Sequence, residues 1–432
     1  MAILTKVKRY IFENITKKNL IMKSIFRLLL MTIVLPVLVR DGYAVGLKYF
    51  RAITVDGQQA IVGKYPLDEK TAEKVNCYRF EYDEQGNLAR VEYLKQGKLR
   101  SDDYFGVARI LIERSNGYEK RIYQNRYGGP VADEDGAYSI RLKLDKNNHP
   151  ISMTIYGRNG SISKNRYGVS HYLWTLDANG RIIKSERFNR NGEKISDTAG
   201  LYETRQKYDQ QGNCVEYANY DKNAKLLEDK SGIAVVRYEY DKHGNPVEAR
   251  GYGSDGKLKR EKDFNVAIVR WKYDDNGNMV EEQYFNTAGQ PEENKTGIAI
   301  VRWEYDDRGN KIAQKYYGAN GRLKADKNTG IAIVRRKYDT RGNEIEESFF
   351  DTTGKLKEDK KLGIAIICYK YDEYGRVIEE KHFGADKNLK ERTDTGIAIV
   401  RWEYDDRGNF VSLKHYGVDG KLKKQRQTKT RK

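Results

Sequence analysis

Few residues in this 432-residue sequence have the types and spacing that catalysis requires. Adjacent acidic pairs such as Glu281-Glu282 and Glu346-Glu347 resemble paired acid–base carboxylates, but neighbouring residues on a strand point to opposite faces. The five histidines are scattered along the chain: His149, His171, His243, His382 and His415. Nucleophile-elbow, metalloprotease, phosphate-loop and dinucleotide motifs are absent from the sequence. We therefore predict no catalytic residues and a protein that is not an enzyme.

Metal-binding patterns are equally weak. Asp274, Asn276 and Asn278 mimic the first three ligands of a calcium loop, but Gly277 stands at position four instead of six, and Phe285 occupies position twelve, where glutamate is required. Turn formation by Asp274 is the better interpretation. The three cysteines, Cys77, Cys214 and Cys368, lie far apart in the sequence, which favours small apolar fillers in strands over a disulfide framework. We predict no metal and no cofactor.

The candidate binding site is the C-terminal segment, residues 421–432. It has seven basic residues and no acidic one: Lys421, Lys423, Lys424, Arg426, Lys429, Arg431 and Lys432. Because the segment also lacks hydrophobic periodicity, we predict a disordered basic tail. Such a tail could hold an anionic glycan, a lipid surface or nucleic acid, and the alternative is a solvated end with no ligand.

An internal repeat dominates the rest of the chain. Tyr-Asp pairs recur every 32 or 33 residues from Tyr208-Asp209 to Tyr404-Asp405, and Leu144-Asp145 and Leu176-Asp177 continue the series towards the N-terminus. About eleven units are countable over residues 76–420, one of them degenerate around Gly117, with a partial one near Asp56-Gly57. A regular period of this length is the mark of a repeat architecture.

Each unit carries the residues of two hairpin turns. Asp-x-x-Gly-Asn between β-rich runs predicts a three-residue loop, in which a type I turn ends at a glycine with positive φ. A second turn follows, as at Asp351-Thr-Thr-Gly354, and a third glycine opens the next unit as Gly-Ile-Ala. We predict an all-β fold: an elongated antiparallel β-hairpin repeat array, solenoid-like or a spiralling sheet, with about three short strands per unit. A propeller blade usually needs about 40–45 residues, so that rival fits poorly.

Alternation along residues 298–305 predicts which side chains are buried. Ala299, Val301 and Trp303 share a buried face with Tyr305, while Ile298, Ile300, Arg302 and Glu304 share a half-solvated one. A three-residue loop would place Arg302 opposite Gln314 within the hairpin, and a two-residue loop would place it opposite Ala313. In most units an acidic residue stands at one of these positions, so we interpret the charges as a ladder that fixes register. The regularly spaced tyrosines are interpreted as core.

The N-terminal 44 residues predict a secretory signal peptide. Lys23 and Arg27 precede an apolar run of twelve residues, Leu28 to Val39, and small residues at Gly42 and Ala44 fit a cleavage site. The run is too short to span a bilayer, so we expect no membrane span after processing. Met22 is a natural start for such a signal. Residues 45–75 are predicted to form an N-terminal cap or a partial repeat.

Charge is concentrated in the two ends. The chain carries 80 basic and 62 acidic side chains, a net charge of +18. Removing residues 1–44 and 421–432 leaves 65 basic and 60 acidic side chains, so the array itself is close to neutral at +5. Nucleic acid is therefore not an expected partner of the array.

Tyr305-Asp-Asp-Arg-Gly-Asn310 and Tyr338-Asp-Thr-Arg-Gly-Asn343 resemble the YD or RHS-type repeats of bacterial exported proteins. That resemblance implies a spiralling antiparallel sheet, which in large members surrounds a toxin. The Gly-x-Ala opening and the period are also similar to WG repeats. The unit is longer than a typical YD unit, and no toxin or protease motif follows Gly420.

We predict an exported, periplasmic, cell-surface or secreted scaffold that is not an enzyme and binds a glycan, a lipid surface or an envelope protein. One alternative is an envelope carbohydrate-active enzyme with a site between repeats, which convergent carboxylates in a pocket near residues 100–135 would favour. Another is a polyanion- or nucleic-acid-binding array, which would need a continuous basic stripe.

Overall fold

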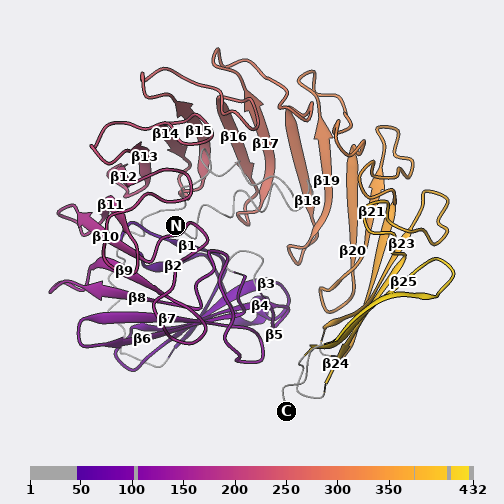
Figure 1. Ribbon diagram of the computed structural model, residues 1–432, viewed down its shortest axis with the longest axis horizontal. Helices are drawn as coiled ribbons and strands as arrows, with labels where there is room; N and C mark the ends of the chain where they lie inside the picture. The colour runs from indigo at the N-terminus through magenta and orange to yellow at the C-terminus, as the bar shows by residue number, and fades with distance from the viewer. Residues whose placement is uncertain (1–45, 102–105, 374, 406–409, 428–432) are drawn as a thin grey trace. The chain divides into compact units, whose positions relative to one another are not determined.

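A computed structural model describes residues 46–101, 106–373, 375–405 and 410–427. The predicted signal region lies outside these residues. Within them the fold is almost entirely antiparallel β-structure, with one short helix, α2 (Glu69–Ala72), so the predicted all-β hairpin repeat array is confirmed (Figure 1). The chain divides into two units: unit 1 comprises Met1–Asn278 and Tyr284–Gln290, and unit 2 comprises Met279–Gln283 and Pro291–Lys432.

The strands of unit 1 are β1 (Leu47–Val55), β2 (Ile61–Leu67), β3 (Asn76–Tyr82), β4 (Leu88–Lys95), β5 (Lys98–Leu99), β6 (Arg109–Ser115), β7 (Tyr118–Gln124), β8 (Ser139–Leu144), β9 (Pro150–Tyr156), β10 (His171–Leu176), β11 (Ile182–Phe188), β12 (Glu203–Tyr208), β13 (Cys214–Tyr220), β14 (Val235–Tyr240), β15 (Pro246–Tyr252) and β16 (Ile268–Tyr273). Strand β17 (Met279–Phe285) is divided between the units. Unit 2 continues with β18 (Ile300–Tyr305), β19 (Lys311–Tyr317), β20 (Ile333–Tyr338), β21 (Glu344–Phe350), β22 (Ile366–Tyr371), β23 (Val377–Phe383), β24 (Ile399–Tyr404), β25 (Phe410–Tyr416) and β26 (Leu422–Gln427).

The Asp-x-x-Gly-Asn segment forms the predicted three-residue hairpin loop. In the β18–β19 hairpin, the backbone N–H of Asp306 donates to the carbonyl of Asn310 at 2.9 Å, and Gly309 has φ of 83°. Oδ1 of Asp306 accepts the N–H groups of Arg308 and Asn310 at 3.1 and 2.7 Å, while Oδ2 accepts Nδ2 of Asn310 at 2.8 Å. The carboxylate thus satisfies the loop's own donors, which is why aspartate recurs there.

In five repeats the tyrosine of the Tyr-Asp pair joins its hairpin to the preceding one. The hydroxyl of Tyr305 donates to the carbonyl of Met279 at 3.0 Å, on the neighbouring strand β17. The same bond recurs from Tyr208 to Ile182, from Tyr240 to Cys214, from Tyr338 to Lys311 and from Tyr371 to Glu344, over 2.6 to 3.0 Å. These tyrosines are therefore structural, with the ring packed and the hydroxyl bonded to backbone.

Neither predicted hairpin register is right. Arg302 lies opposite Lys315, because two residues, Lys311 and Ile312, oppose Tyr305 in a β-bulge beside the loop and shift the ladder by one. The acidic partner of Arg302 is instead Glu281 of the preceding hairpin, with Nε and Oε2 2.6 Å apart. The charge ladder exists, but it fixes neighbouring hairpins to each other.

Burial over residues 298–305 follows the predicted alternation with two exceptions, of which one is Tyr305, half-buried instead of buried. Ala299, Val301 and Trp303 are buried and Arg302 and Glu304 are exposed, as expected. Ile298 is also buried, with 2 % of its surface exposed, because it belongs to a third turn that the sequence analysis missed. There Oδ1 of buried Asn294 accepts the N–H groups of Thr296 and Ile298. Each complete repeat thus has three turns and two strands, with a single bridging residue such as Leu323 where a third strand was predicted.

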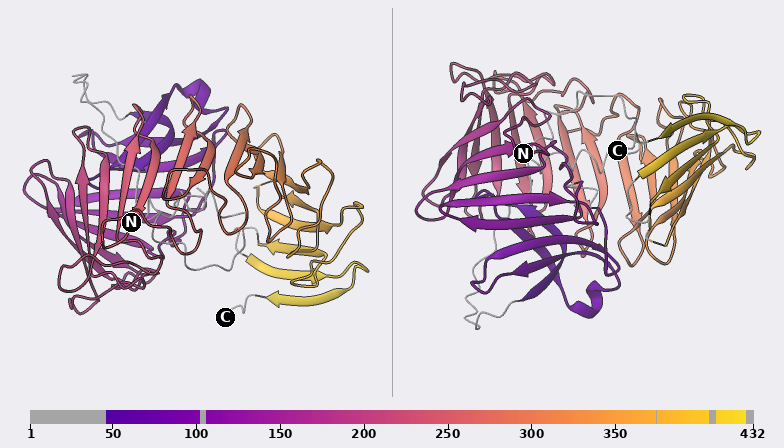
Figure 2. Two further views of the ribbon diagram at one scale, coloured as in Figure 1. Left: turned by 90° about the horizontal axis from the view of Figure 1, so that it is seen from above. Right: turned by 60° about the horizontal axis from the view of Figure 1, so that its bottom comes forward.

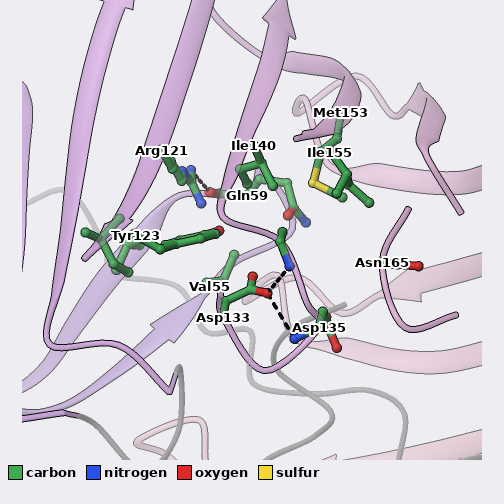
Figure 3. Close-up of a pocket in the computed structure, with 13 residues that line it drawn as sticks. Val55, Gln59, Arg121, Tyr123, Asp133, Asp135, Ile140, Met153, Ile155 and Asn165 are labelled. Carbon is green, nitrogen blue, oxygen red and sulfur yellow. Dashed lines mark hydrogen bonds between the residues drawn. The ribbon is translucent and has the colours of Figure 1, made fainter. Parts of the chain in front are cut away.

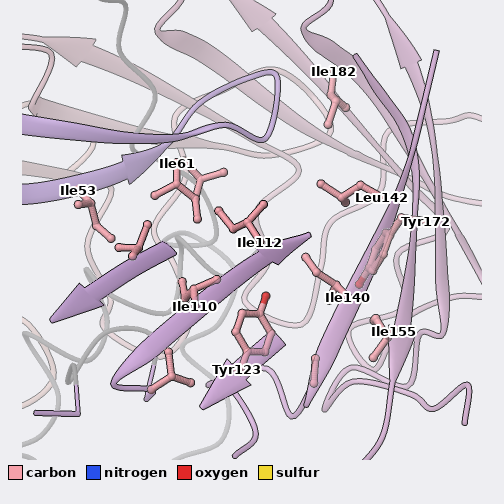
Figure 4. Packing of buried hydrophobic residues seen from close by; sticks show 14 of the residues in the cluster. Ile53, Ile61, Ile110, Ile112, Tyr123, Ile140, Leu142, Ile155, Tyr172 and Ile182 are labelled. Atoms are coloured by element: carbon pink, nitrogen blue, oxygen red, sulfur yellow. The ribbon is translucent and has the colours of Figure 1, made fainter. Parts of the chain in front are cut away.

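The core of unit 1 is closed by its N-terminal hairpin. Ile53 and Val55 of β1 and Ile61 of β2 pack in one cluster with Ile110, Ile140, Ile155 and Ile182 (Figure 4). Strands β6 to β9 pair antiparallel in succession, and the right view of Figure 2 shows purple strands of this part of the chain side by side. Residues 46–75, the described part of the predicted cap or partial repeat, therefore supply the hairpin that packs into the core of unit 1.

That hairpin also crosses the first turns of several repeats. The carbonyl of Gly57 accepts the N–H of Ile182 at 2.9 Å, and Nζ of Lys64 donates to the carbonyl of Gly244 at 3.0 Å. Next to it, Nδ2 of Asn245 donates to the hydroxyl of Tyr65 at 2.7 Å. Gly277 is required here, because a Cβ atom would lie 2.2 Å from the Tyr65 ring.

The prediction of a disordered C-terminal tail is partly wrong. Residues 422–427 form strand β26, which pairs with β25 from Tyr416↔Leu422 to Ser412↔Gln427. In the preceding repeats the next hairpin occupies this edge, as β20 does along β19. The backbone N–H and C=O groups at the edge of β25 need hydrogen-bond partners. Residues 422–427 therefore form a strand, although their side chains do not alternate between polar and apolar. Lys429, Arg431 and Lys432 lie outside the described residues.

Candidate functional site

A cavity of about 50 Å³ lies under the N-terminal hairpin in unit 1 (Figure 3). Its polar lining includes Asp133, Asp135, Arg121, Tyr123 and Asn165, and its apolar lining includes the side chains of Val55, Ile61, Ile140 and Ile155. Gln59 completes one wall, where its carbonyl accepts Nη2 of Arg121. The two carboxylates lie within residues 100–135, the region in which convergent acids would favour an enzyme.

Asp133 is the most perturbed carboxyl of this cavity. Its Oδ1 accepts the backbone N–H groups of Asp135 and Ala137 at 3.0 and 2.8 Å. Burial, and then the charge of Asp135, raise the pKa of Asp133 to about 8. Asp135 itself faces Arg166, with Oδ1 3.2 Å from Nε. Asp133 is therefore a protonated buried acid at neutral pH.

The cavity is small for a sugar. Ligand pockets usually enclose about 300–1,000 Å³, and a cavity needs only about 10–15 Å³ to hold one water molecule. The space beside Asp133 therefore has room for a few water molecules. We interpret Asp133 and Asp135 as members of the third turn, in which Asp133 holds the position of Asn165 and Asn294 in other repeats.

The second candidate lies in unit 2, on the side of the sheet that carries Trp303, here called the core face. At the position of Trp303 in the first strand of successive repeats stand Arg336, Tyr369 and Trp402. Trp303 is 3 % exposed and the side chain of Arg336 8 %, whereas Tyr369 and Trp402 are half-buried. The core face is thus apolar and closed at β18, carries a buried charge at β20, and is partly open at β22 and β24.

Arg336 and two glutamates form the first part of this polar region. Nη2 of Arg336 donates to Oε1 of Glu347 at 2.6 Å, and its Nε lies 3.5 Å from Oε2 of Glu344. Burial opposes the charge on Arg336, but the carboxylates of Glu347 and Glu344 outweigh it and raise the pKa of the guanidinium. Nη1 of Arg336 is buried and has no acceptor among the described residues.

Tyr369 stands between acidic side chains. It lies opposite Glu380 in the β22–β23 ladder. Burial, followed by the charges of Glu380, Glu347 and Glu344, raises the pKa of Tyr369, so the hydroxyl stays neutral. A half-buried ring with carboxylates on both sides can stack against a ring-shaped ligand and accept its hydroxyl protons.

His382 holds Glu380 in place. Its Nε2 lies 2.5 Å from Oε1 of Glu380, and its Nδ1 lies 2.9 Å from the carbonyl oxygen of Ile397. A carbonyl oxygen can only accept, so the contact with Ile397 assigns a proton to Nδ1 of His382. This contact orients the imidazole with Nε2 against the carboxylate of Glu380. His382 is 1 % exposed, while Tyr284, Tyr316 and Phe349 hold this position in earlier repeats.

The opposite, solvent face has a regular row of arginines. Each guanidinium lies over an aromatic ring of its own hairpin, for example Arg302 over Tyr317 at 4.8 Å and Arg401 over Tyr416 at 5.1 Å. Arg302 and Arg401 also pair with acids of the preceding hairpin, Glu281 and Glu379, whereas Arg335 lies opposite Ala313. Because acid and base alternate, this row is no basic stripe, and sequence reasoning identified it correctly as a structural ladder.

The basic C-terminal segment is largely engaged with the repeats. Nζ of Lys423 lies 2.6 Å from Oε2 of Glu391 and donates to the carbonyl of Gly396 at 2.7 Å. The ion pair repeats that of Lys324 with Glu293. Lys421 lies 3.5 Å from Asp419, and Lys424 lies opposite His415. Arg426 is part of β26. The described part of this segment thus completes the final repeat.

Other sequence candidates have structural roles. Asp274 accepts the backbone N–H groups of Asn276 and Asn278, as turn formation requires. Cys77 and Cys214 are buried, Cys368 is half-buried, and none forms a disulfide. Over the described ranges no cluster of three or more histidine, cysteine or acidic side chains could hold a metal ion. No helix among the described residues is long and apolar enough to cross a membrane.

The fold and the paired hairpins define an antiparallel β-hairpin repeat protein. No family model matches the sequence, and no curated protein is similar to it. Among solved structures, the chain is similar to the crystal structure of TcdB2-TccC3-TEV, with 12% identity and a TM-score of 0.38 over 84% of this chain and 20% of that one. It is also similar to the Tc holotoxin pore of Photorhabdus luminescens, with 12% identity and a TM-score of 0.28 over 87% and 22% of the two chains.

A porin-like protein from Bacteroides uniformis has 8% identity and a TM-score of 0.22, over 56% of this chain and 90% of that one. This chain spans about a fifth of the length of the two toxin chains. Likenesses of this size carry no argument about function.

Proposed function

We propose that the protein is an exported repeat scaffold of the YD or RHS type, without enzymatic activity, which binds a glycan or a protein of the cell envelope through the core face of unit 2. The Tyr-Asp-x-x-Gly-Asn turns support the repeat type, and the predicted signal region supports export. The anionic glycan and lipid ligands expected of a free basic tail are less well supported, because Lys421 and Lys423 pair with acids of the repeats.

One observation supports the core face of unit 2 as the binding surface. The repeat framework is the same from β18 to β25, yet the position of buried Trp303 is taken by the largely buried charge of Arg336 and by half-buried Tyr369. Burying charged groups such as Arg336 and Glu347 contributes little to stability compared with apolar packing. A departure of this kind from an apolar pattern is best explained by recognition of a ligand.

Sedimentation with isolated bacterial cell walls and outer-membrane vesicles tests the proposal. We expect the full chain to sediment with one of these fractions, and the double variant Glu347→Gln, Glu380→Gln to remain in the supernatant. Gln314 occupies the corresponding position one repeat earlier, so the variant should fold. Tyr127→Phe, at an exposed loop tyrosine, is the matched control. Equal sedimentation of wild type and double variant, or release of reducing sugars by the purified protein, would contradict the proposal.

The enzyme alternative has one observation in its favour, the pair Asp133 and Asp135 beside a cavity. It requires the β1–β2 hairpin to leave that cavity before any sugar can enter. Polysaccharide hydrolysis that is abolished by Asp135→Asn would support this alternative.

A further inference from the structure

The charges on the core face of unit 2 restrict the kind of ligand that it can take. Its carboxylates belong to Glu344, Glu347, Glu380 and Asp394. Arg336 pairs with the first two, and Nη2 of Arg392 lies 2.7 Å from Oδ2 of Asp394. The imidazole of His382 contacts the third carboxylate, that of Glu380.

Lys424 supplies the remaining positive charge. It lies opposite His415 on the β25–β26 ladder, and both Lys424 and Glu380 influence the pKa of His415, which burial lowers first. Four carboxylates thus face three basic side chains and one imidazole, so the region carries little net charge. A strongly anionic or cationic ligand gains little from such a surface.

We propose that this region of the core face binds a neutral oligosaccharide, with one sugar ring stacked on Tyr369 and its hydroxyl groups donating to the carboxylates of Glu380 and Glu347. The site rests on the proposed function and assigns it a ligand class. Charge-assisted hydrogen bonds from neutral hydroxyls to carboxylates are about twice as strong as those between neutral groups. Carboxylates held by Arg336 and His382 lose little freedom on binding.

The position of a second aromatic residue indicates more than one sugar ring. Trp402 of β24 is half-buried at the same repeat position as Tyr369 of β22. The two strands are two ladder spacings apart, so the rings are separated by roughly 10 Å or more. An extended oligosaccharide can contact both aromatic side chains, whereas a monosaccharide reaches only one.

His382 is a positioning residue for Glu380. Without it, the carboxylate would lie half-buried beside Tyr369, because Lys381 of the same strand points to the opposite face and pairs with Glu379. We expect His382→Phe to fold, because Phe349 holds this position in the preceding repeat, and to weaken binding through Glu380. Glu380→Gln in the His382→Phe background should recover part of the affinity, since a neutral amide needs no counter-charge.

Isothermal titration of the full chain with oligosaccharides tests the site. The probes are the neutral hexamers of glucose and of N-acetylglucosamine, oligogalacturonate as the acidic probe, and chitosan oligomers as the cationic probe. We expect a neutral hexamer to bind with an affinity that does not change with salt, and Tyr369→Ala to weaken it about tenfold. Tyr369→Trp should keep the affinity, because tryptophan occupies this position at residues 303 and 402.

Preferential binding of the acidic or the cationic probe, or an affinity that falls steeply with salt, would overturn the neutral-ligand site. If Tyr369→Ala abolishes sedimentation with cell walls while no neutral hexamer binds, the ligand class is wrong and the scaffold function stands. If neutral hexamers bind equally to wild type and Tyr369→Ala, the location is wrong.

Discussion

The hydroxyl of Tyr240 offers a direct test of how neighbouring hairpins are held together. It donates to the carbonyl oxygen of Cys214 at 2.9 Å, one hairpin earlier in unit 1. Tyr240→Phe removes this bond and keeps the ring. We expect the variant to fold, with a lower stability confined to the strands on either side of the lost bond.

The magnitude follows from the environment of the bond. A hydrogen bond contributes about 0.5–1.5 kcal/mol net, and an unsatisfied buried partner costs about 1–3 kcal/mol. Cys214 is fully buried, so its carbonyl has little access to water. We therefore expect a loss of about 1–2 kcal/mol from Tyr240→Phe, which corresponds to roughly a 5–30-fold change in the local opening equilibrium.

Hydrogen exchange measured by mass spectrometry is the appropriate assay, because long repeat arrays need not unfold in one step. Peptides from β13, β14 and β15 should exchange roughly 5–30-fold faster in Tyr240→Phe, while peptides from β8 and β9 should not change. Tyr127→Phe, which alters a tyrosine that is 49% exposed, serves as the control. Exchange from β13 to β15 within about twofold of wild type would refute the role assigned to the Tyr-Asp tyrosines.

Three further perturbations test other parts of the fold. Folding raises the pKa of Asp133 from 3.8 to about 8, so the folded state binds this proton more tightly than the unfolded state. The free energy of unfolding should therefore fall as pH rises between these two values. Asp133→Asn should raise the Tm at pH 8 and make the Tm depend less on pH. A Tm that depends on pH as in wild type would contradict this. Ending the chain at Gly420 removes β26 and leaves the edge of β25 unpaired, so this variant should aggregate, as measured by light scattering. Ending the chain at Gln427 keeps β26 and should not promote aggregation. Equal scattering from the two variants would refute the idea that β26 protects the edge of β25. Ile61→Ala should cost about 2–4 kcal/mol in urea unfolding, and a loss below about 1 kcal/mol would show that the β1–β2 hairpin does not belong to the core.

The sequence allowed the turns and the repeat to be predicted because their chemistry is local. Asp306 and Gly309 act within five residues of each other, and their types alone specify the loop. The register of Arg302 was missed because a bulge beside the loop leaves no signal in residue types. The glycine before Ile298 is a partial signal for the third turn. The first residue of that turn is a weaker signal, because it is asparagine in some repeats, as at Asn294, and aspartate in others.

Contacts between distant residues were beyond sequence reasoning. Tyr65 reaches Asn245 across 180 positions, and neither residue departs from an ordinary hairpin pattern. The basic composition of residues 421–427 hid a strand, because the partner that orders it is the backbone of β25. The polar region around Tyr369 is detectable in the sequence. Arg336 and Tyr369 stand at the repeat position where Trp303 and Trp402 are apolar.

Photo-crosslinking from position 369 tests the central claim most directly. A benzophenone amino acid replaces Tyr369 in one sample and Tyr317, on the solvent face of the same unit, in another. After irradiation with isolated cell walls, we predict covalent capture of envelope material from position 369 and none from position 317. Capture from position 317 alone would contradict the assignment of the core face of unit 2 as the binding surface.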